Sequence, residues 1–193
     1  WTVDEVFDRV AANVASVIED GSCLAFSLGP LFEALGRHLV RKRHLGIHTP
    51  FFMDSLMDLV KSGAVTNRYK EIFRGKSLTS YAFGTPDLMT WLNRNPLVEF
   101  QGIDKVFTPA QIGRNPRFVA VLPARKADLS GRIVLHAGRG KVTASSSEVV
   151  DFVKGAEISP GGRTVIALSS RNRRNESNLR ISVEAFPNQF ILR

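Results

Sequence analysis

The sequence predicts an α/β fold: one three-layer domain with an open, mainly parallel sheet and helices on both faces. Short apolar segments typical of strands alternate with amphipathic segments typical of helices. Most of the strand segments are short and apolar, as in a sheet that is buried on both faces, and the segment at 180–186 partly alternates. Thr85-Pro86 and Thr108-Pro109 each place an N-cap residue before a proline, a pattern that opens helices.

The helices are predicted from apolar residues at helical spacing. The first begins at a Thr2–Glu5 capping box, carries an apolar stripe from Val3 to Ile18, and ends before Gly21. The other helices are expected at residues 31–42, 53–61, 86–93 and 147–154, with a further helix opened by Pro109.

The strands are predicted at residues 22–26, 45–49, 77–83, 118–122, 132–137, 164–168 and 180–186. A turn at Ser130-Gly131 is expected to join the strands at 118–122 and 132–137. In open parallel sheets, ligands bind at loops that follow the carboxyl ends of the strands. We therefore expect a site at the loops after Phe26, Thr49, Phe83 and Leu122.

The bulk composition is that of a globular protein. With 193 residues, 44% of them apolar and 23% charged, residues 1–193 are expected to form a single domain, and the start at Trp1 suggests a fragment of a longer chain. Cys23 is the only cysteine, which excludes an internal disulfide and allows a reducing compartment, so we expect the cytoplasm. The four histidines lack ligand spacing, so no metal is expected, and no apolar run is long enough for a membrane helix.

The chain is basic, with 26 Lys+Arg against 18 Asp+Glu and a net charge of +8. This excess favours polyanionic partners, among them a phosphate-bearing cofactor. The basic residues cluster at 37–43 and 171–174, and the alternative interpretation is that both clusters are solvated surface. Aromatic residues do not interleave with these clusters as they do in single-strand-binding proteins, so nucleic acid is not expected as a partner.

Several short motifs follow one another along the chain. They are G-I-H-T at 46–49, S-G-A-V-T-N at 62–67, F-G-T at 83–85, N-P-L-V-E-F at 95–100, D-L-S-G at 128–131, D-F-V-K-G-A at 151–156 and S-P-G-G at 159–162. In their order and spacing they resemble the acetyl-CoA hydrolase/CoA-transferase family, and specifically its C-terminal domain.

The resemblance implies a CoA-transferase-like fold of two similar α/β domains that bind CoA or acyl-CoA between them. It implies covalent catalysis in which a glutamate carboxylate becomes a glutamyl-CoA thioester. The expected partners are an acyl-CoA, a carboxylic acid and an N-terminal half or another fused domain, and a second copy of the chain is left open. The residues that match the family's CoA region are Gly29, Gly84, Ser147, Glu148, Asp151 and Phe152.

The chain departs from the family where the chemistry is expected. The position of the family glutamate is Pro50, which offers no nucleophile and no backbone N–H. The family's G-G-Q corresponds to Ser147-Glu148-Val149, whose side chains enter the space that glycines leave to a ligand. The family's I-N-S-A corresponds to residues 121–124, V-L-P-A, which lack the amide side chain.

Three functions are compatible with this pattern. The first is an acyl-CoA-handling or regulatory module without the covalent glutamate. The second is an active CoA-transferase or acyl-CoA hydrolase, in which Glu148 or a missing N-terminal half supplies the chemistry. The third is a basic binding module, which the cluster at 171–174 would serve. The residues present favour the first.

Overall fold

A parallel sheet forms the centre of the computed structural model, which describes residues 2–136, 146–183 and 190–192. Its strand order is β10-β7-β1-β2, and every neighbouring pair is parallel. Their bounds are β1 Cys23–Ala25, β2 Gly46–Ile47, β7 Phe118–Pro123 and β10 Arg163–Ala167. Beyond β2 the pairing continues through a parallel bridge from His48 to Leu78 in β4 (Ser77–Thr79), which pairs with β6 (Val98–Phe100).

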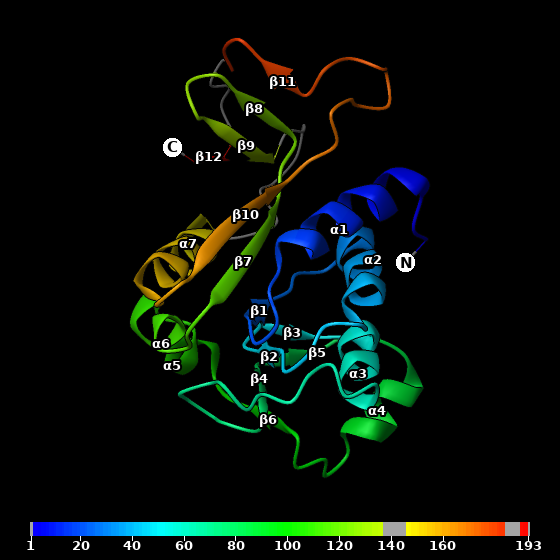
Figure 1. Cartoon of the computed structure of the whole chain (residues 1–193), viewed down its shortest axis with the longest axis vertical. Coiled ribbons are helices and arrows are strands. Elements are labelled where there is room, and N and C mark those ends of the chain that lie inside the picture. Colours follow the sequence, from blue (N-terminus) through cyan, green and yellow to red (C-terminus); the bar gives the residue numbers. More distant parts are fainter. Residues whose placement is uncertain (1, 137–145, 184–189, 193) are drawn as a thin grey trace.

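Helices cover both faces of this sheet, so the predicted three-layer α/β fold is confirmed (Figure 1). The first face carries α1 (Glu5–Val17), α2 (Pro30–Leu39), α3 (Asp54–Lys61) and α4 (Pro86–Leu92). The second face carries α5 (Ile103–Val106), α6 (Pro109–Gly113) and α7 (Ser146–Ile158). Along β7 the side chains alternate between the two cores, with Val119 and Val121 in the first and Phe118 and Ala120 in the second.

A second, smaller sheet was not predicted. It has the order β11-β8-β9-β12, with bounds β8 Lys126–Asp128, β9 Ile133–His136, β11 Leu179–Arg180 and β12 Phe190–Leu192. The β8–β9 and β9–β12 pairs are antiparallel, whereas β8 and β11 are parallel. Figure 1 shows that it lies beyond the carboxyl ends of β7 and β10, the two strands that lead into it.

Several predicted boundaries were wrong. The first helix is capped by Asp4, whose carboxylate accepts the N–H of Phe7 at 2.9 Å, and not by Thr2. The Ser130-Gly131 turn joins β8 to β9, because the chain forms a new strand after β7. The predicted strand at 77–83 divides into β4 and β5 (Tyr81–Ala82), which pairs with β3 (Phe51–Phe52). Of the predicted strand at 180–186, residues 184–186 lie outside the described part of the chain.

Within the described ranges, no helix combines the length and the apolar content that crossing a bilayer requires. No group of three or more His, Cys, Asp or Glu side chains in those ranges is arranged to hold a metal ion.

Candidate functional site

The parallel strands place most of the predicted site residues at the edge of the sheet where the strands end, which we call the carboxyl edge. The loops after β1 and β2, which contain Gly29 and Pro50, follow the carboxyl ends of these strands. Helix α7 ends near the amino end of β7, where Arg117 N donates to Pro160 O at 2.8 Å. Because α7 packs along β7 and β10, its first turn, with Ser147 and Glu148, points toward the carboxyl edge.

Position 50 is held firmly in this edge. Pro50 is buried, and its carbonyl oxygen accepts the N–H groups of Ser80 (3.2 Å) and Tyr81 (2.9 Å) and the hydroxyl of Thr79 (3.1 Å). Because one carbonyl takes both N–H groups, the chain kinks at Ser80 and β4 and β5 separate. The position that matches the family glutamate therefore has a structural role without an ionisable group.

Thr49 joins the ends of β1 and β2. Its hydroxyl donates to the carbonyl of Phe26 at 2.6 Å and accepts the N–H of Phe26 at 2.9 Å. Both residues are buried. These two bonds fix the loops on either side of the candidate site relative to each other.

His48, the histidine of the G-I-H-T motif, does not face the carboxyl edge. Its ring is fully buried in the second face, with the ring centroid 5.0 Å from that of Phe107. Nε2 lies 2.8 Å from the carbonyl of Val106 and Nδ1 lies 2.8 Å from the amide nitrogen of Asn115. Nε2 must donate and Nδ1 must accept, so the ring is neutral. Burial and the charge of Lys70 lower the pKa of His48 to about 3, which removes it as a general base.

Gly84 lies where α3 and α4 begin. A Cβ on Gly84 would come within 2.1 Å of Oδ2 of Asp54 and 2.7 Å of Leu88. The same carboxylate accepts the N–H of Thr85 at 3.1 Å and its hydroxyl, so it fixes the start of α4. Asp54, the first residue of α3, thus has a structural role, and the absence of a side chain at Gly84 allows its carboxylate to approach.

The backbone at Gly29 has open space beside it. It is buried, has φ +128°, a conformation that favours glycine, and a Cβ there would meet nothing within 4 Å. It is the N-cap of α2, and Pro30 follows at the first helical position. A ligand group can therefore approach the backbone here without meeting a side chain.

The residues on α7 divide into two groups. Phe152 is only 7% exposed and packs between Phe107 and Phe118, so we assign its ring to the core and not to a ligand. Asp151 is partly buried on the same helix. Ser147 and Glu148 belong to the first turn of α7, within the helix predicted at 147–154, and their side chains lie outside the described part of the structure.

With this geometry in place, comparison with known proteins is decisive. The family model "Acetyl-CoA hydrolase/transferase C-terminal domain" matches residues 84–192. The chain belongs to this family. The fold and the resemblance predicted from the motifs are thereby confirmed.

The relatives in this family are CoA transferases. The chain is 34% identical over 166 residues to the 4-hydroxybutyrate coenzyme A transferase of Clostridium kluyveri, covering 86% of this chain and 39% of the relative. It is 32% identical over 168 residues to the succinyl-CoA:cyclohexane-1-carboxylate CoA transferase of Geobacter metallireducens, covering 87% and 38%. The chain thus spans less than half the length of these relatives.

Solved structures are similar to this chain over almost its whole length. RipA from Yersinia pestis superposes with a TM-score of 0.85 at 27% identity, over 96% of this chain and 41% of RipA. A 4-hydroxybutyrate CoA-transferase from Porphyromonas gingivalis superposes with a TM-score of 0.83 at 29% identity, over 97% and 45% of the two chains.

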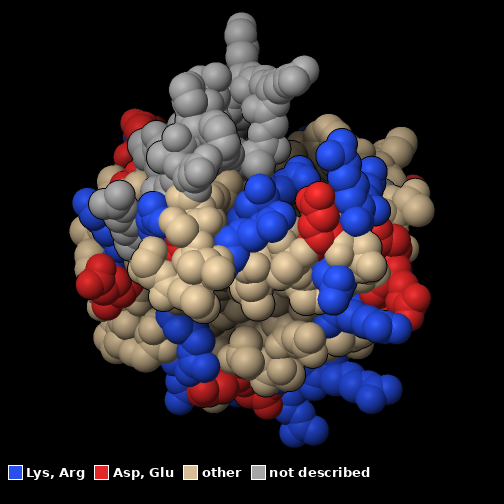
Figure 2. All heavy atoms as spheres, turned by 90° about the horizontal axis from the view of Figure 1, so that it is seen from above, with Lys and Arg blue, Asp and Glu red and all other residues tan. Residues whose placement is uncertain are grey.

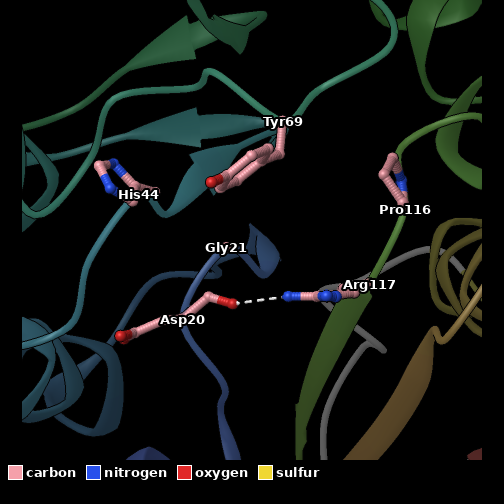
Figure 3. Close-up of a pocket in the computed structure, with 6 residues that line it drawn as sticks. All are labelled: Asp20, Gly21, His44, Tyr69, Pro116 and Arg117. Atoms are coloured by element: carbon pink, nitrogen blue, oxygen red, sulfur yellow. Dashed lines mark hydrogen bonds between the residues drawn. The ribbon is translucent and has the colours of Figure 1, made fainter.

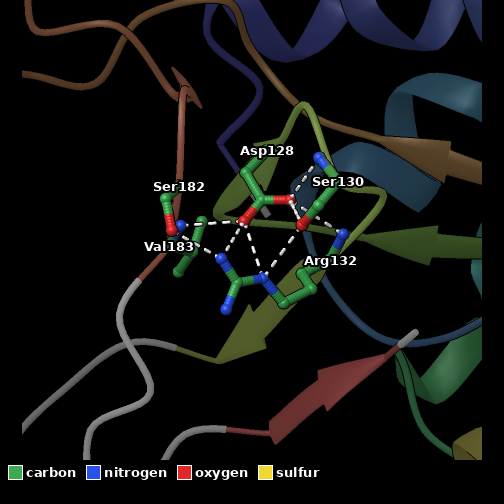
Figure 4. A network of polar contacts seen from close by, with 5 residues as sticks. All are labelled: Asp128, Ser130, Arg132, Ser182 and Val183. Carbon is green, nitrogen blue, oxygen red and sulfur yellow. Dashed lines mark hydrogen bonds and ion pairs between the residues drawn. The ribbon is translucent and has the colours of Figure 1, made fainter.

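Two family motifs serve the scaffold. In S-G-A-V-T-N, the side chain of Asn67 accepts the N–H of Ile47 at 2.8 Å and donates to Ser77 at 3.1 Å. In D-L-S-G, Asp128 accepts hydrogen bonds from Ser130, from Arg132 and from the N–H of Val183 (Figure 4). Loss of water raises the pKa of Asp128, but these donors outweigh that effect and hold the pKa well below its usual range.

Lys70 was missed by the sequence analysis. It is 1% exposed, and its Nζ donates to the carbonyls of Ile47 (2.8 Å) and Lys76 (2.7 Å). Burial lowers the pKa of Lys70 to about 8 and raises that of the neighbouring Cys23 thiol to about 11. Cys23 is buried in β1, and Lys70 is bonded to the backbone of β2, so we assign both groups to the scaffold.

A cavity of about 410 Å³ lies at the opposite edge of the sheet (Figure 3). It is lined by Asp20, Gly21, His44, Tyr69, Pro116 and Arg117, which precede β1, β2 and β7 or border their amino ends. Arg117 crosses it and donates to the carbonyl of Asp20 at 3.1 Å. Since ligands of open parallel sheets bind at the carboxyl edge, this cavity is not the family's substrate site.

Proposed function

We propose that this chain is an acyl-CoA-handling module that binds CoA or an acyl-CoA at the carboxyl edge without forming the glutamyl-CoA thioester itself. The observation that carries the proposal is Pro50. It keeps the backbone contacts of its loop through its carbonyl oxygen but has no carboxylate. The loops around it are fixed by hydrogen bonds: Thr49 bonds to Phe26, and Asp54, which approaches Gly84 closely, accepts the N–H of Thr85.

In this proposal, the acyl-CoA approaches the open backbone at Gly29 and the exposed turn at Gly84, with the first turn of α7 on the other side. Asp151 remains a predicted contact, and Ser147 and Glu148 remain predicted to narrow the site. Residues 1–193 are proposed to act as one domain beside an N-terminal half or another fused domain. A carboxylic acid acceptor, a cytoplasmic location and pairing with a second copy stay predictions.

A second candidate is an active CoA-transferase or acyl-CoA hydrolase. It is favoured by the relatives, which are CoA transferases, and by the position of Glu148 in the first turn of α7. Glu148, or residues of an N-terminal half, would then provide the nucleophile.

The test is titration calorimetry of the full-length gene product with CoA and acetyl-CoA, followed by borohydride reduction and mass mapping. We expect binding and no reduced adduct at Pro50. No binding at millimolar ligand refutes the proposal, and a reduced adduct on Glu148 replaces it with the second candidate.

A matched pair of glycine variants locates the site. Gly29 and Gly63 both have positive φ, +128° and +81°, and open space around a Cβ. Only Gly29 lies at the carboxyl edge, because Gly63 follows α3 next to Ala64, whose carbonyl accepts the N–H of Leu45 before β2. We expect Gly29→Ala to weaken CoA binding and Gly63→Ala to leave it unchanged.

A further inference from the structure

The loop between β10 and β11 extends the carboxyl edge. It leaves the main sheet after Ala167 and enters the second sheet at Leu179, and Figure 1 shows it at the end of the molecule beyond the carboxyl ends of β7 and β10. It contains the basic run 171–174, for which the sequence analysis left open whether it is solvated surface or a binding feature.

The loop has a defined conformation. The side-chain oxygen of Asn172 accepts the N–H groups of Arg174 (2.9 Å) and Glu176 (3.0 Å), and its amide donates to the Glu176 carboxylate at 2.8 Å. Arg171 donates through Nη1 to the carbonyl of Asn175 at 2.8 Å and pairs with Ser177 in an antiparallel bridge. The basic side chains therefore stand on a fixed backbone, which lowers the entropy cost of binding a ligand.

Cations from three elements meet at this loop. Arg174 comes from the loop, Arg180 from β11 and Lys126 from β8, and Nη2 of Arg180 lies 3.7 Å from Glu176. The hydrogen bond from Asn172 and then the charges of Arg180, Arg174 and Lys126 lower the pKa of Glu176. The charges of Arg180, Arg174 and Lys126 act on this one carboxylate, and Arg171 stands on the same loop, where it donates to Asn175. We call these four cations the basic cluster. Figure 2, which looks onto this end of the molecule, shows exposed Lys and Arg side chains with fewer Asp and Glu side chains among them.

The uncompensated charge defines the ligand class. Like charges held close together repel one another, and a dianion with several acceptor oxygens relieves that repulsion. Arginine is well suited to a phosphate because its planar donors contact two oxygens at once. The basic cluster therefore fits a phosphate group presented from the carboxyl edge.

We propose that the basic cluster binds the 3′-phosphate at the nucleotide end of CoA. The inference rests on the proposed function, which places the thioester end near Gly29 and Gly84. The pantetheine arm of CoA is long and separates the thioester from the phosphates, and β8, β11 and the loop that carry the cluster lie beyond the carboxyl ends of β7 and β10 (Figure 1). The cluster then selects CoA over ligands that lack this phosphate.

The experiment compares CoA with 3′-dephospho-CoA in calorimetric titrations of the full-length gene product. The variant is Arg174→Glu, which keeps the backbone hydrogen bond to Asn172. The matched control is Arg41→Glu, another exposed arginine, which follows the carboxyl end of α2 at the opposite edge of the sheet.

We expect Arg174→Glu to weaken CoA binding by about tenfold or more, as expected for the loss of a charged hydrogen bond. It should leave the affinity for 3′-dephospho-CoA within about twofold, and Arg41→Glu should change neither affinity by more than that. The wild-type protein should prefer CoA, and the preference should shrink at high salt.

If CoA binds and Arg174→Glu binds it as tightly as the wild type, the inference is refuted and the proposed function stands. Equal loss of affinity for both nucleotides also refutes it, because the effect would then not involve the 3′-phosphate. If neither nucleotide binds the wild-type protein, both proposals fail.

Discussion

The buried imidazole of His48 makes stability depend on pH between neutrality and mild acid. In the folded chain the ring accepts from Asn115 and donates to Val106, and protonation would break the first of these bonds. Its pKa is about 3, below the ordinary value of 6.5. As the pH falls below about 6.5, the unfolded chain therefore takes up a proton that the folded chain refuses, and the free energy of unfolding decreases.

The size of this effect follows from the two pKa values. With about 6.5 for the unfolded chain and about 3 for the folded chain, the free energy of unfolding falls by about 2.5 kcal/mol between pH 7 and pH 4.5. The carboxylates whose pKa values are lowered, Glu99, Asp128 and Glu176, lose most of their contribution as the pH falls below about 4.5, where their unfolded counterparts protonate. The interval from pH 7 to pH 4.5 therefore isolates His48.

The assay is urea denaturation at several pH values across this interval, with the wild type and His48→Gln. Glutamine can still donate to Val106 but does not titrate, so the variant should be less stable at pH 7 and lose most of the acid dependence. His44→Gln, which removes a partly buried histidine at the amino-terminal edge, is the control and should keep the dependence. Equal slopes for wild type and His48→Gln, or an NMR signal of a His48 imidazolium above pH 5, would refute the reasoning.

Three further predictions concern the edge and the buried lysine. Gly84→Ala should lower the free energy of unfolding by about 1–3 kcal/mol, because its Cβ would overlap Asp54, whereas Gly102→Ala, which meets only the tip of Asp104, should stay within about 0.5 kcal/mol in urea denaturation. Pro50→Glu should not form a reducible CoA adduct on mass mapping, since position 50 is buried, which raises a carboxylate's pKa, and Glu148 is predicted to add a second negative charge; an adduct at residue 50 would contradict this. Between pH 8 and pH 9 the wild type should gain about 1 kcal/mol of stability relative to Lys70→Met, because the folded amine, with a pKa of about 8, loses its proton before the unfolded one; parallel urea midpoints of the two proteins would speak against it.

The sequence predicted those elements that local patterns determine. Helix α4 begins at Pro86 with Thr85 as its cap, as the Thr-Pro pair indicates, and β7 covers the predicted apolar run. The missed strands β3 and β8 contain two and three residues, and they are strands only because Phe51 pairs with Tyr81 and Lys126 with Val134. The partner of Phe51 is distant in sequence, and both strands are too short for a local periodicity to indicate them.

The candidate site, too, was predictable only where local sequence determines the position of a residue. The motifs located the carboxyl edge, because the order of strands and loops fixes where Gly29 and Pro50 lie. They did not reveal the partners of His48, since Asn115 and Val106 are 67 and 58 residues away in the sequence. Nor did they separate Phe152, a core residue, from its helix neighbour Asp151, because a helix beside a site contributes one face to the core and the other to the site.

The contacts of Pro50 with its loop are independent of its side chain. The hydrogen bonds that hold the loop, from Ser80, Tyr81 and Thr79, all end on the backbone carbonyl, which any residue would supply. Neighbouring loops are held by side-chain hydrogen bonds instead, made by the hydroxyl of Thr49 and the amide of Asn67. Replacement of Thr49 or Asn67 would leave buried backbone groups unpaired and destabilise the edge. The contacts made by position 50 do not depend on its side chain, so the loop can hold proline there without losing any of them.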